Sequence, residues 1–367
     1  MEVIQSQGYS IYLENKEFNN LSHFLNTRNY KKIFVLCDDN TIRFCMPRIE
    51  PLLKKLNYSV ILLRHGEEYK TMQNVEYIWA QLLKKGATRF DLLINLGGGV
   101  ISDIGGFAAT LYKRGIDFVN IPTTLLAQID ASVGGKNGID WAGIKNMIGT
   151  FSNPNAVFIF NGFLYTLPEQ ELFSGGAEVL KHGLLSTKAL WEKAQKLYFF
   201  YEHKQLAELN GLLLECITVK NDIVAQDWKD TGARQSLNLG HTVAHSLEAW
   251  ALGKAYELKH GEAVILGLIA ELNLSARLLN VDKNQIESIL AVISSIYKKT
   301  VFWQKWATLK INIDELLVYL YADKKNESGQ LLLPLWLDFG KIALAQQVDK
   351  TQIEWAFGRL AIELRQF

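Results

Sequence analysis

Apolar residues in the first half of the chain alternate between short continuous runs and runs with helical spacing. Residues 32–37, 58–66 and 91–96 are short, mostly apolar stretches of the kind that form buried strands. Between the second and the third, residues 72–86 repeat apolar positions at helical spacing and end at a glycine, which is a common helix stop. The pattern therefore predicts strand, strand, helix and strand in this order.

The same alternation continues with a predicted helix at 100–112 and a predicted strand at 116–122. Strands that alternate with helices on this scale are typical of a parallel sheet covered by helices. We therefore expect an α/β N-terminal domain with a mainly parallel sheet.

The pattern changes after about residue 166, where helical spacing dominates. Only residues 330–337 and 341–347 are typical of a late pair of strands. A chain of 367 residues is more than one hydrophobic core usually holds. We expect two domains, an α/β domain at 1–166 and a mostly helical domain at 167–367.

Composition narrows the class of protein without identifying it. The 39 Lys and Arg residues nearly balance the 38 Asp and Glu residues, so no long-range field draws the whole chain to nucleic acid or to an anionic membrane. Three scattered cysteines (Cys37, Cys45 and Cys216) argue against a disulfide framework. No signal peptide is found, and the apolar run 263–270 is too short for a membrane span. A cytoplasmic enzyme or binding protein is expected.

Three glycines stand directly between a predicted strand and a predicted helix, in INLGGGVISDIGGF. Residues without Cβ let a phosphate approach the backbone, and a helix N-terminus offers N–H groups and partial positive charge. A nucleotide pyrophosphate is the natural ligand at Gly98, Gly99 and Val100. The spacing is not GxGxxG, however, so a tight turn without a ligand remains the alternative.

The segment 112–140, which follows the glycine turn and its helix, is polar where a core helix would be apolar. Within it, Gly134 and Gly135 stand beside Lys136 and resemble a second site for an anion. Taken singly, each lysine here is typical of a solvated surface, but the clustering favours phosphate binding. The candidate binding residues are Arg114, Asp130 and Lys136 in this segment, with Lys145 and Asn146 shortly after it.

His241 and His245 lie four apart in a helical pattern, so both face one side of the helix. A catalytic zinc site takes three protein ligands, and two His with one Glu would suit it. Spacing alone leaves several sets open: the helical pair itself, one of the pair with His260, or Glu178 with His182. A helical His pair without a function is also common.

The chain resembles the 3-dehydroquinate synthase family, a group of sugar-phosphate cyclases, because it contains the family's motifs in the same order. The similarity extends over nearly the whole chain and rests on GEEYKT, GGGVISDIGGF, YKRGI, PTTLLAQIDASVGGKNGID, KNMIG, TLPEQELFSGGAEVLKHG, RQSLNLGHTVAH, KHGEAV and DKKN.

The resemblance implies the conversion of 3-deoxy-D-arabino-heptulosonate 7-phosphate to 3-dehydroquinate and phosphate, a step of the shikimate pathway. In the implied reaction, a hydride is transferred from the substrate to NAD, phosphate is eliminated, and NADH then returns the hydride. The ring is closed by an aldol step. The protein mainly orients the reacting groups. A cleft between the two domains is the expected location.

The resemblance also implies which residues bind the cofactors. The metal, Zn²⁺ or Co²⁺, would be held by Glu178, His241 and His260, so that His245 faces the substrate. The implied NAD residues are Asp38, Glu67, Lys70, Gly98, Gly99, Val100, Asp103, Thr123, Thr124, Lys136 and Lys145.

For the substrate, the resemblance implies one group of residues at each end. The phosphate would meet Lys136, Asn146, His245 and Lys325, and the carboxylate would meet Lys220, Arg234 and Asn238. Arg114 is implied to act across a homodimer interface, and Asp130, Lys145 and Lys181 to complete the polar shell. Because the chain is nearly neutral, these local cations must supply the attraction for an anionic substrate.

The chain departs from the family pattern at three positions. Trp228 stands where the family often has Glu, Asn137 where Thr is common, and Asn161 where Asp is common. None of these changes removes a group that carries chemistry, but they bear on fine contacts and on metal preference.

Three rival functions remain. A metal-dependent polyol or alcohol dehydrogenase shares the layout but needs no phosphate cradle such as Lys136 and Lys325. A sister cyclase acting on sedoheptulose 7-phosphate or glucose 6-phosphate has no substrate carboxylate, so it would not need Arg234 and Lys220. A non-catalytic nucleotide-binding or structural protein would not require three metal-type ligands.

Overall fold

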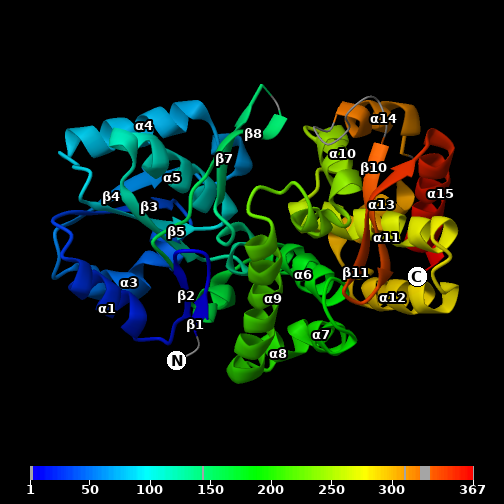
Figure 1. Cartoon of the computed structure of the whole chain (residues 1–367), viewed down its shortest axis with the longest axis horizontal. Coiled ribbons are helices and arrows are strands. Elements are labelled where there is room, and N and C mark those ends of the chain that lie inside the picture. The colour runs from blue at the N-terminus through cyan, green and yellow to red at the C-terminus, as the bar shows by residue number, and fades with distance from the viewer. Residues whose placement is uncertain (1–2, 143, 310, 323–330, 367) are drawn as a thin grey trace. The chain divides into compact units, whose positions relative to one another are not determined.

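The protein is described by a computed structural model that covers residues 3–142, 144–309, 311–322 and 331–366 (Figure 1). The chain forms two compact units, and the boundary expected near residue 166 lies close to their junction at Pro168. The N-terminal unit consists of Met1–Pro168 and Leu206–Ala225, and the C-terminal unit of Glu169–Gln205 and Gln226–Phe367.

The N-terminal unit contains a mainly parallel sheet with the strand order β1-β2-β9-β6-β5-β3-β4. Only the β1–β2 pair of this sheet is antiparallel. The strands predicted at 32–37, 58–66, 91–96 and 116–122 are confirmed as β3 to β6. The bounds are β1 (Val3–Gln5), β2 (Ser10–Leu13), β3 (Ile33–Asp38), β4 (Tyr58–Leu63), β5 (Leu92–Gly97), β6 (Asp117–Pro122) and β9 (Ala156–Ile159).

The sheet is covered by helices on both faces, which explains why its central strands are apolar throughout (Figure 1). Along β3, Val35 faces a core shared with α1 (Asn19–Arg28) and α3 (Met46–Leu53), while Phe34 faces a core shared with α4 and α5. The bounds of the remaining helices here are α2 (Thr41–Phe44), α4 (Met72–Lys84) and α5 (Gly99–Leu111).

Two further elements of this unit differ from the expectation: a hairpin that was not predicted, and a helix whose pattern was predicted but was expected in the 167–367 domain. A hairpin of β7 (Lys136–Trp141) and β8 (Ile144–Phe151) packs against α5. Helix α9 (Leu206–Gln226) also belongs here rather than with the helices that flank it in sequence. Its Asn221 side chain donates to the carbonyl of Gln5 at 3.3 Å, and the Gln7 side chain donates to the carbonyl of Ala225 at 2.8 Å.

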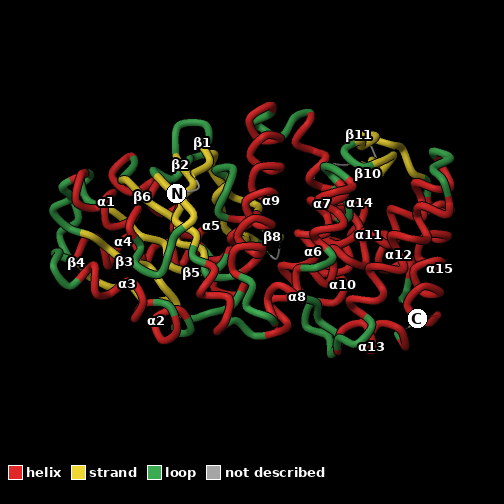
Figure 2. Tube along the Cα trace, turned by 90° about the horizontal axis from the view of Figure 1, so that it is seen from below, coloured by secondary structure: helices red, strands yellow, loops and turns green. Residues whose placement is uncertain are grey.

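The C-terminal unit is mostly helical, as expected, and Figure 2 marks its helices in red. Helix α11 is its centre, because every residue from Gly261 to Ser275 is buried. The predicted late strands are confirmed as β10 and β11. The bounds are α6 (Glu169–Leu184), α7 (Lys188–Ala194), α8 (Leu197–Glu202), α10 (His241–Ala251), α11 (His260–Leu278), α12 (Lys283–Tyr297), α13 (Val301–Thr308), α14 (Ile313–Ala322), β10 (Leu331–Asp338), β11 (Lys341–Val348) and α15 (Lys350–Gln366).

Among the described residues, no helix combines the length and the apolar character that crossing a bilayer requires. The three cysteines are buried thiols and form no disulfide with one another.

Candidate active site

The residues expected to bind NAD follow the carboxyl ends of neighbouring parallel strands. Asp38 ends β3, Lys70 follows β4, Gly98 follows β5 and Thr123 follows β6. The chain runs outward from β3 to β4 and then returns past β3 to β5, so the strand order reverses between β3 and β5. Ligands of open parallel sheets bind at the carboxyl ends of the strands at such a reversal.

The glycine turn of this edge leads straight into α5. Gly98 is the residue before the helix, and no side chain caps it, so the first N–H groups of α5 lie open at the strand ends. The backbone N–H of Thr123 donates to the carbonyl of Gly97 at 3.0 Å, which holds the 123–124 loop against the turn. This arrangement is typical of an anion site at a helix N-terminus.

Lys70 and Asp103 form a buried ion pair beside this turn, with 2.6 Å between Nζ and Oδ2. The ammonium of Lys70 lies 3.8 Å from the carboxylate of Glu67 and donates to Oδ1 of Asn146 at 2.5 Å. Burial alone would lower the pKa of Lys70, but the negative charges of Asp103 and Glu67 outweigh it and raise that pKa. Lys70 is therefore a fixed cation at the strand ends.

Asp38 serves the local backbone as well as the site. Its Oδ1 accepts hydrogen bonds from the N–H groups of Asn40 (3.0 Å) and Thr41 (2.7 Å) at the start of α2. This contact fixes the turn that follows β3.

Lys220 of α9 contacts Asp130 in the polar segment after β6. Its Nζ donates to both the carbonyl and Oδ1 of Asp130, each at 2.5 Å. The structure therefore joins two expected site residues that lie ninety positions apart in the chain.

Other expected substrate residues of the N-terminal unit are exposed. Arg114 has left-handed backbone (φ 68°) in a turn after α5, and Lys136, Lys145 and Asn146 lie on the β7–β8 hairpin. The N–H of Asn146 donates to the Asp140 carboxylate at 2.7 Å, which fixes the turn that carries it. Lys325 lies outside the described residues.

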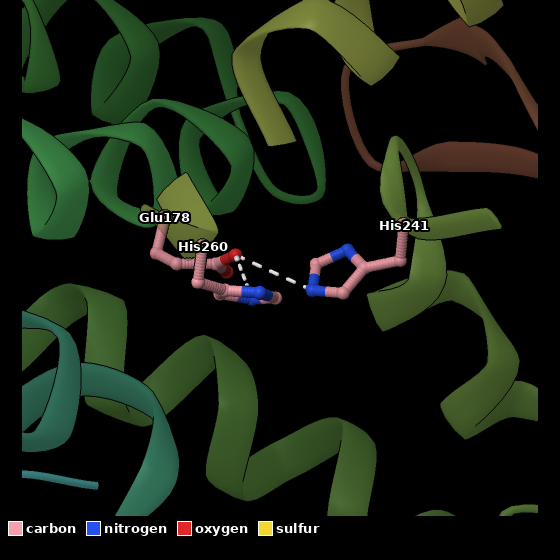
Figure 3. Close-up of side chains that lie close together, drawn as sticks. All are labelled: Glu178, His241 and His260. Carbon is pink, nitrogen blue, oxygen red and sulfur yellow. Dashed lines mark ion pairs between the residues drawn. The ribbon is translucent and has the colours of Figure 1, made fainter. Parts of the chain in front are cut away.

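The expected metal ligands converge in the C-terminal unit (Figure 3). The ligand atoms of Glu178 (α6), His241 (first residue of α10) and His260 (first residue of α11) all lie within 4.8 Å of one another. Oε1 of Glu178 is 3.4 Å from Nε2 of His241 and 3.9 Å from Nε2 of His260. Glu178 is fully buried, and the two rings are partly exposed.

The atoms of this cluster fit a cation. Nδ1 of His241 lies 3.2 Å from the carbonyl of Leu239, which can only accept, so Nδ1 carries the proton and Nε2 the lone pair. Within the described residues, Oε1 of Glu178 accepts no hydrogen bond. Electron pairs of a buried carboxylate and an imidazole therefore face one another, and a divalent ion of the zinc type would be bound by this donor set.

Lys181 and His245 flank the cluster. The ammonium of Lys181, which is 1% exposed, pairs with Glu178 and donates to the carbonyl of Leu237 at 2.8 Å. The ring of His245 lies 5.6 Å from that of His241 and 6.2 Å from that of His260. Three histidine rings thus gather at one place.

Close helix contacts hold the ligands in place. Gly261, directly after His260, approaches α6 so tightly that a Cβ atom there would lie 1.8 Å from the carbonyl oxygen of Ser174. The Ser174 hydroxyl accepts the Gly261 N–H at 3.0 Å. Since Ser174 lies one turn before Glu178, this contact sets the distance between two of the ligands.

Arg234 lies in a buried turn that precedes α10. Its Nη1 donates to the carbonyl of Trp228 at 2.8 Å, and its backbone N–H donates to the Asp227 carboxylate at 3.1 Å. Asp227 also accepts from the N–H groups of Thr231 and Gly232. Asn238, at the end of the same turn, is half-buried.

The three departures from the family pattern have structural contacts. The amide of Asn137 donates to the carbonyls of Gly135 (3.2 Å) and Ser152 (2.8 Å) and so holds the loop before β7. The amide of Asn161 donates to the side chain of Asn210 in α9. Trp228 contributes its backbone carbonyl to Arg234, an interaction that does not depend on its side chain.

Sequence reasoning missed two buried carboxylates next to the histidines, Glu248 and Glu271. Glu248 follows His241 by seven residues and His245 by three, which places all three on one helical face. That spacing was a usable signal. No comparable signal points to Glu271, because its contact is with the backbone of another helix.

Two family models match the chain. The 3-dehydroquinate synthase N-terminal model matches residues 60–174, and the 3-dehydroquinate synthase C-terminal model matches residues 175–326. Among curated relatives, 3-dehydroquinate synthase of Parabacteroides distasonis is 37% identical over 333 residues, which is 91% of this chain and 92% of the relative.

Solved structures with the same fold are more distant in sequence. The 2-epi-5-epi-valiolone synthase from Streptomyces hygroscopicus, with NAD⁺ and Zn²⁺ bound, superposes with a TM-score of 0.83 at 22% identity and covers 99% of both chains. A 2-deoxy-scyllo-inosose synthase with carbaglucose-6-phosphate, NAD⁺ and Co²⁺ has a TM-score of 0.81 at 21% identity, covering 96% of this chain and 98% of that one.

Proposed function

We propose that this chain, which belongs to the 3-dehydroquinate synthase family, converts 3-deoxy-D-arabino-heptulosonate 7-phosphate to 3-dehydroquinate and phosphate. The observation that carries the proposal is the convergence of Glu178, His241 and His260. The rival dehydrogenases and sister cyclases are disfavoured because the relative that covers 91% of this chain at 37% identity is itself a 3-dehydroquinate synthase.

Residues 1–166 together with α9 form the proposed NAD-binding domain, and the rest of residues 167–367 forms the proposed metal- and substrate-binding domain. The NAD assignment is supported by the strand reversal between β3 and β5 and by the uncapped N-terminus of α5. Lys70, Asp103 and Glu67 would position the nucleotide there, with Asp38 and the 123–124 loop on either side. Lys136 and Lys145 of the hairpin are assigned to the same ligand.

The metal assignment is supported by the lone pairs that face one another in the cluster. When bound, the divalent ion supplies Lewis acidity at a substrate hydroxyl, and NAD supplies the acceptor for the neighbouring hydride. Glu178, His241 and His260 would hold the ion. Lys181 pairs with Glu178 and so fixes the carboxylate's direction.

The two ends of the substrate, its carboxylate and its phosphate, are each assigned to a group of cationic and polar side chains. Arg234 is proposed to bind the carboxylate, because its planar fork can bond both oxygens, with Lys220 and Asn238 beside it. The phosphate is assigned to Lys136, Asn146, His245 and Lys325, and Asp130 is proposed to hold Lys220 in place.

We further propose a cytoplasmic homodimer in which Arg114 completes the partner's site. The reduced cysteines and the exposure of Arg114 support this. Light scattering should give twice the monomer mass. A mixture of R114A and E178Q proteins, each inactive, should regain part of the activity, because a mixed dimer holds one complete site. A monomeric mass would contradict the dimer.

The deciding experiment supplies the keto-acid phosphate with NAD far below the substrate concentration. Phosphate should appear stoichiometrically with the substrate while no NADH accumulates. Chelation should stop the reaction, and added Zn²⁺ or Co²⁺ should restore it. Consumption of NAD one for one would identify a dehydrogenase instead, and full activity in exhaustively metal-free protein would refute the metal assignment.

A further inference from the structure

The two ring nitrogens of His260 face two different carboxylates. Nε2 lies 3.9 Å from Oε1 of Glu178, on the side of the metal cluster. Nδ1 lies 3.5 Å from Oε2 of Glu248, on the other edge of the ring. The ring therefore has one nitrogen for the ion and one for a second acidic group.

Glu248 is placed for this contact by α10. It lies two turns after His241, and its side chain is 5% exposed, so its carboxylate is held inside the unit rather than in solvent. A carboxylate at this depth needs a compensating donor or charge. The imidazole of His260, whose Nδ1 lies 3.5 Å from Oε2, offers such a donor.

His241 shows the same arrangement with a different acceptor. Its Nε2 faces Glu178, and its Nδ1 faces the carbonyl of Leu239 at 3.2 Å. Both proposed ligand rings thus turn Nε2 toward one point and Nδ1 toward an oxygen that accepts. Ligand histidines usually donate their second N–H in this way, because it fixes the tautomer and the ring orientation.

We propose that Glu248 is a positioning residue for the metal site: its carboxylate accepts the Nδ1 proton of His260 and holds Nε2 toward the ion. Glu248 acts through His260 and does not contact the ion. Its negative charge also makes the imidazole a stronger donor toward a cation. This role depends on the metal site proposed above.

Geometry favours positioning over direct ligation. His245, Glu248 and His260 also have ligand atoms within 4.8 Å of one another, so they form a competing set. That set would leave out Glu178, whose side chain is fully buried, while Nδ1 is the His260 nitrogen that faces Glu248. The set that includes Glu178 instead uses Nε2 of His260, which faces the fully buried carboxylate of Glu178.

The test measures Zn²⁺ affinity of the metal-free protein by competition with a chromogenic chelator. E248A should bind Zn²⁺ about 10–100-fold more weakly than wild type, the usual cost of losing such a partner. E248Q keeps an oxygen that accepts the N–H but loses the charge, so its loss should be smaller. E363A removes another buried carboxylate of the same unit, which pairs with Arg359 at 2.7 Å, and should leave the affinity unchanged.

The visible spectrum of the Co²⁺ form adds a readout that separates positioning from ligation. E248Q should keep the wild-type band positions, since the ligand atoms are unchanged, whereas H241A should shift them. A shifted E248Q spectrum together with an H245A loss as large as that of H241A would identify Glu248 as a ligand and overturn the proposal.

Wild-type affinity in E248A would overturn the positioning role alone and leave the metal site standing. Failure of the wild-type protein to bind Zn²⁺ would remove the metal site and the positioning role together. E248Q is isosteric, so it keeps the question answerable if E248A does not fold.

Discussion

The carboxylate of Glu271 in α11 accepts a 2.6 Å hydrogen bond from the backbone N–H of Gly240, the residue before the proposed metal ligand His241. Glu271 is fully buried. Gly240 has a φ of +80°, and a Cβ atom there would lie 2.9 Å from Cγ of Leu268 in α11. The start of α10 is thus held against α11, which itself begins at a second proposed ligand, His260.

Replacing Glu271 with Ala should therefore weaken both the fold and the metal site. The buried N–H of Gly240 loses its acceptor, and a cavity remains, so the free energy of unfolding should fall by about 2–4 kcal/mol. Urea unfolding of the metal-free protein measures this change. E271Q, which retains an acceptor oxygen, is the matched control and should lose less; equal losses would contradict the hydrogen-bond explanation.

Arg234→Ala tests the grip on the substrate carboxylate. An anion left without its partner in a buried site costs about 3–5 kcal/mol, so kcat/KM should fall roughly 10²–10⁴-fold. R234K should recover only part of this loss, because Lys cannot bond both carboxylate oxygens. K229A removes an exposed charge from the same turn and should have little effect. Steady-state kinetics near wild type for R234A would refute the assignment.

The turn that carries Arg234 should loosen in acid. Desolvation works against the charge of Asp227, but N–H donors from Thr231, Gly232 and Arg234 outweigh it and hold the pKa of this carboxyl below its ordinary value. A carboxyl with a lowered folded pKa stabilises the fold above its unfolded pKa, about 3.9, and loses that contribution as the pH falls further.

Thermal unfolding of wild type and D227N between pH 6 and pH 3 measures this contribution. Wild type should unfold at the higher temperature at pH 6. The gap should shrink toward pH 3, because below about 3.9 the unfolded state takes up a proton at Asp227 more readily than the folded state does. A gap that stays constant or widens in acid would show that the ionised carboxylate is not what holds the turn.

Lys70→Met tests the buried pair at the strand ends. Asp103 would be left without its cation, so the fold should lose about 3–5 kcal/mol, and NAD should bind more weakly. The double variant K70M/D103N should be more stable than K70M alone, because the uncompensated charge is gone. Chemical unfolding and calorimetric NAD titration give the two readouts. Strictly additive losses would mean that the two side chains do not interact.

The strands β3 to β6 and the helices between them could be predicted because buried parallel strands are apolar throughout and their helices are amphipathic. The β7–β8 hairpin escaped prediction because its pattern is interrupted by Gly138, Lys145 and Gly149, and most of its apolar side chains, Trp141 and Phe151 among them, are exposed. A hairpin that buries few of its apolar side chains leaves little signal in the sequence.

At the candidate site, the types of residue present predicted a metal site, but their spacing did not predict which residues come together. Spacing left the partners of His241 undecided, whereas the folded chain brings Glu178 and His260 to it from sixty-three positions before and nineteen positions after. Contacts to backbone atoms, such as Leu239 with His241 and Gly240 with Glu271, depend on how helices pack. No side-chain pattern encodes them.

Helix α9 makes the order of synthesis matter. The sheet unit is interrupted by residues 169–205 of the other unit. It is completed only when α9 supplies Lys220 to Asp130 and the amide of Asn221 to the carbonyl of Gln5 in β1. As the chain emerges from the ribosome, the N-terminal unit cannot be completed until residue 225 has been synthesised. By then α6 to α8 of the other unit have already been made. A gene truncated after residue 168 would therefore yield a sheet lacking one of its own supports.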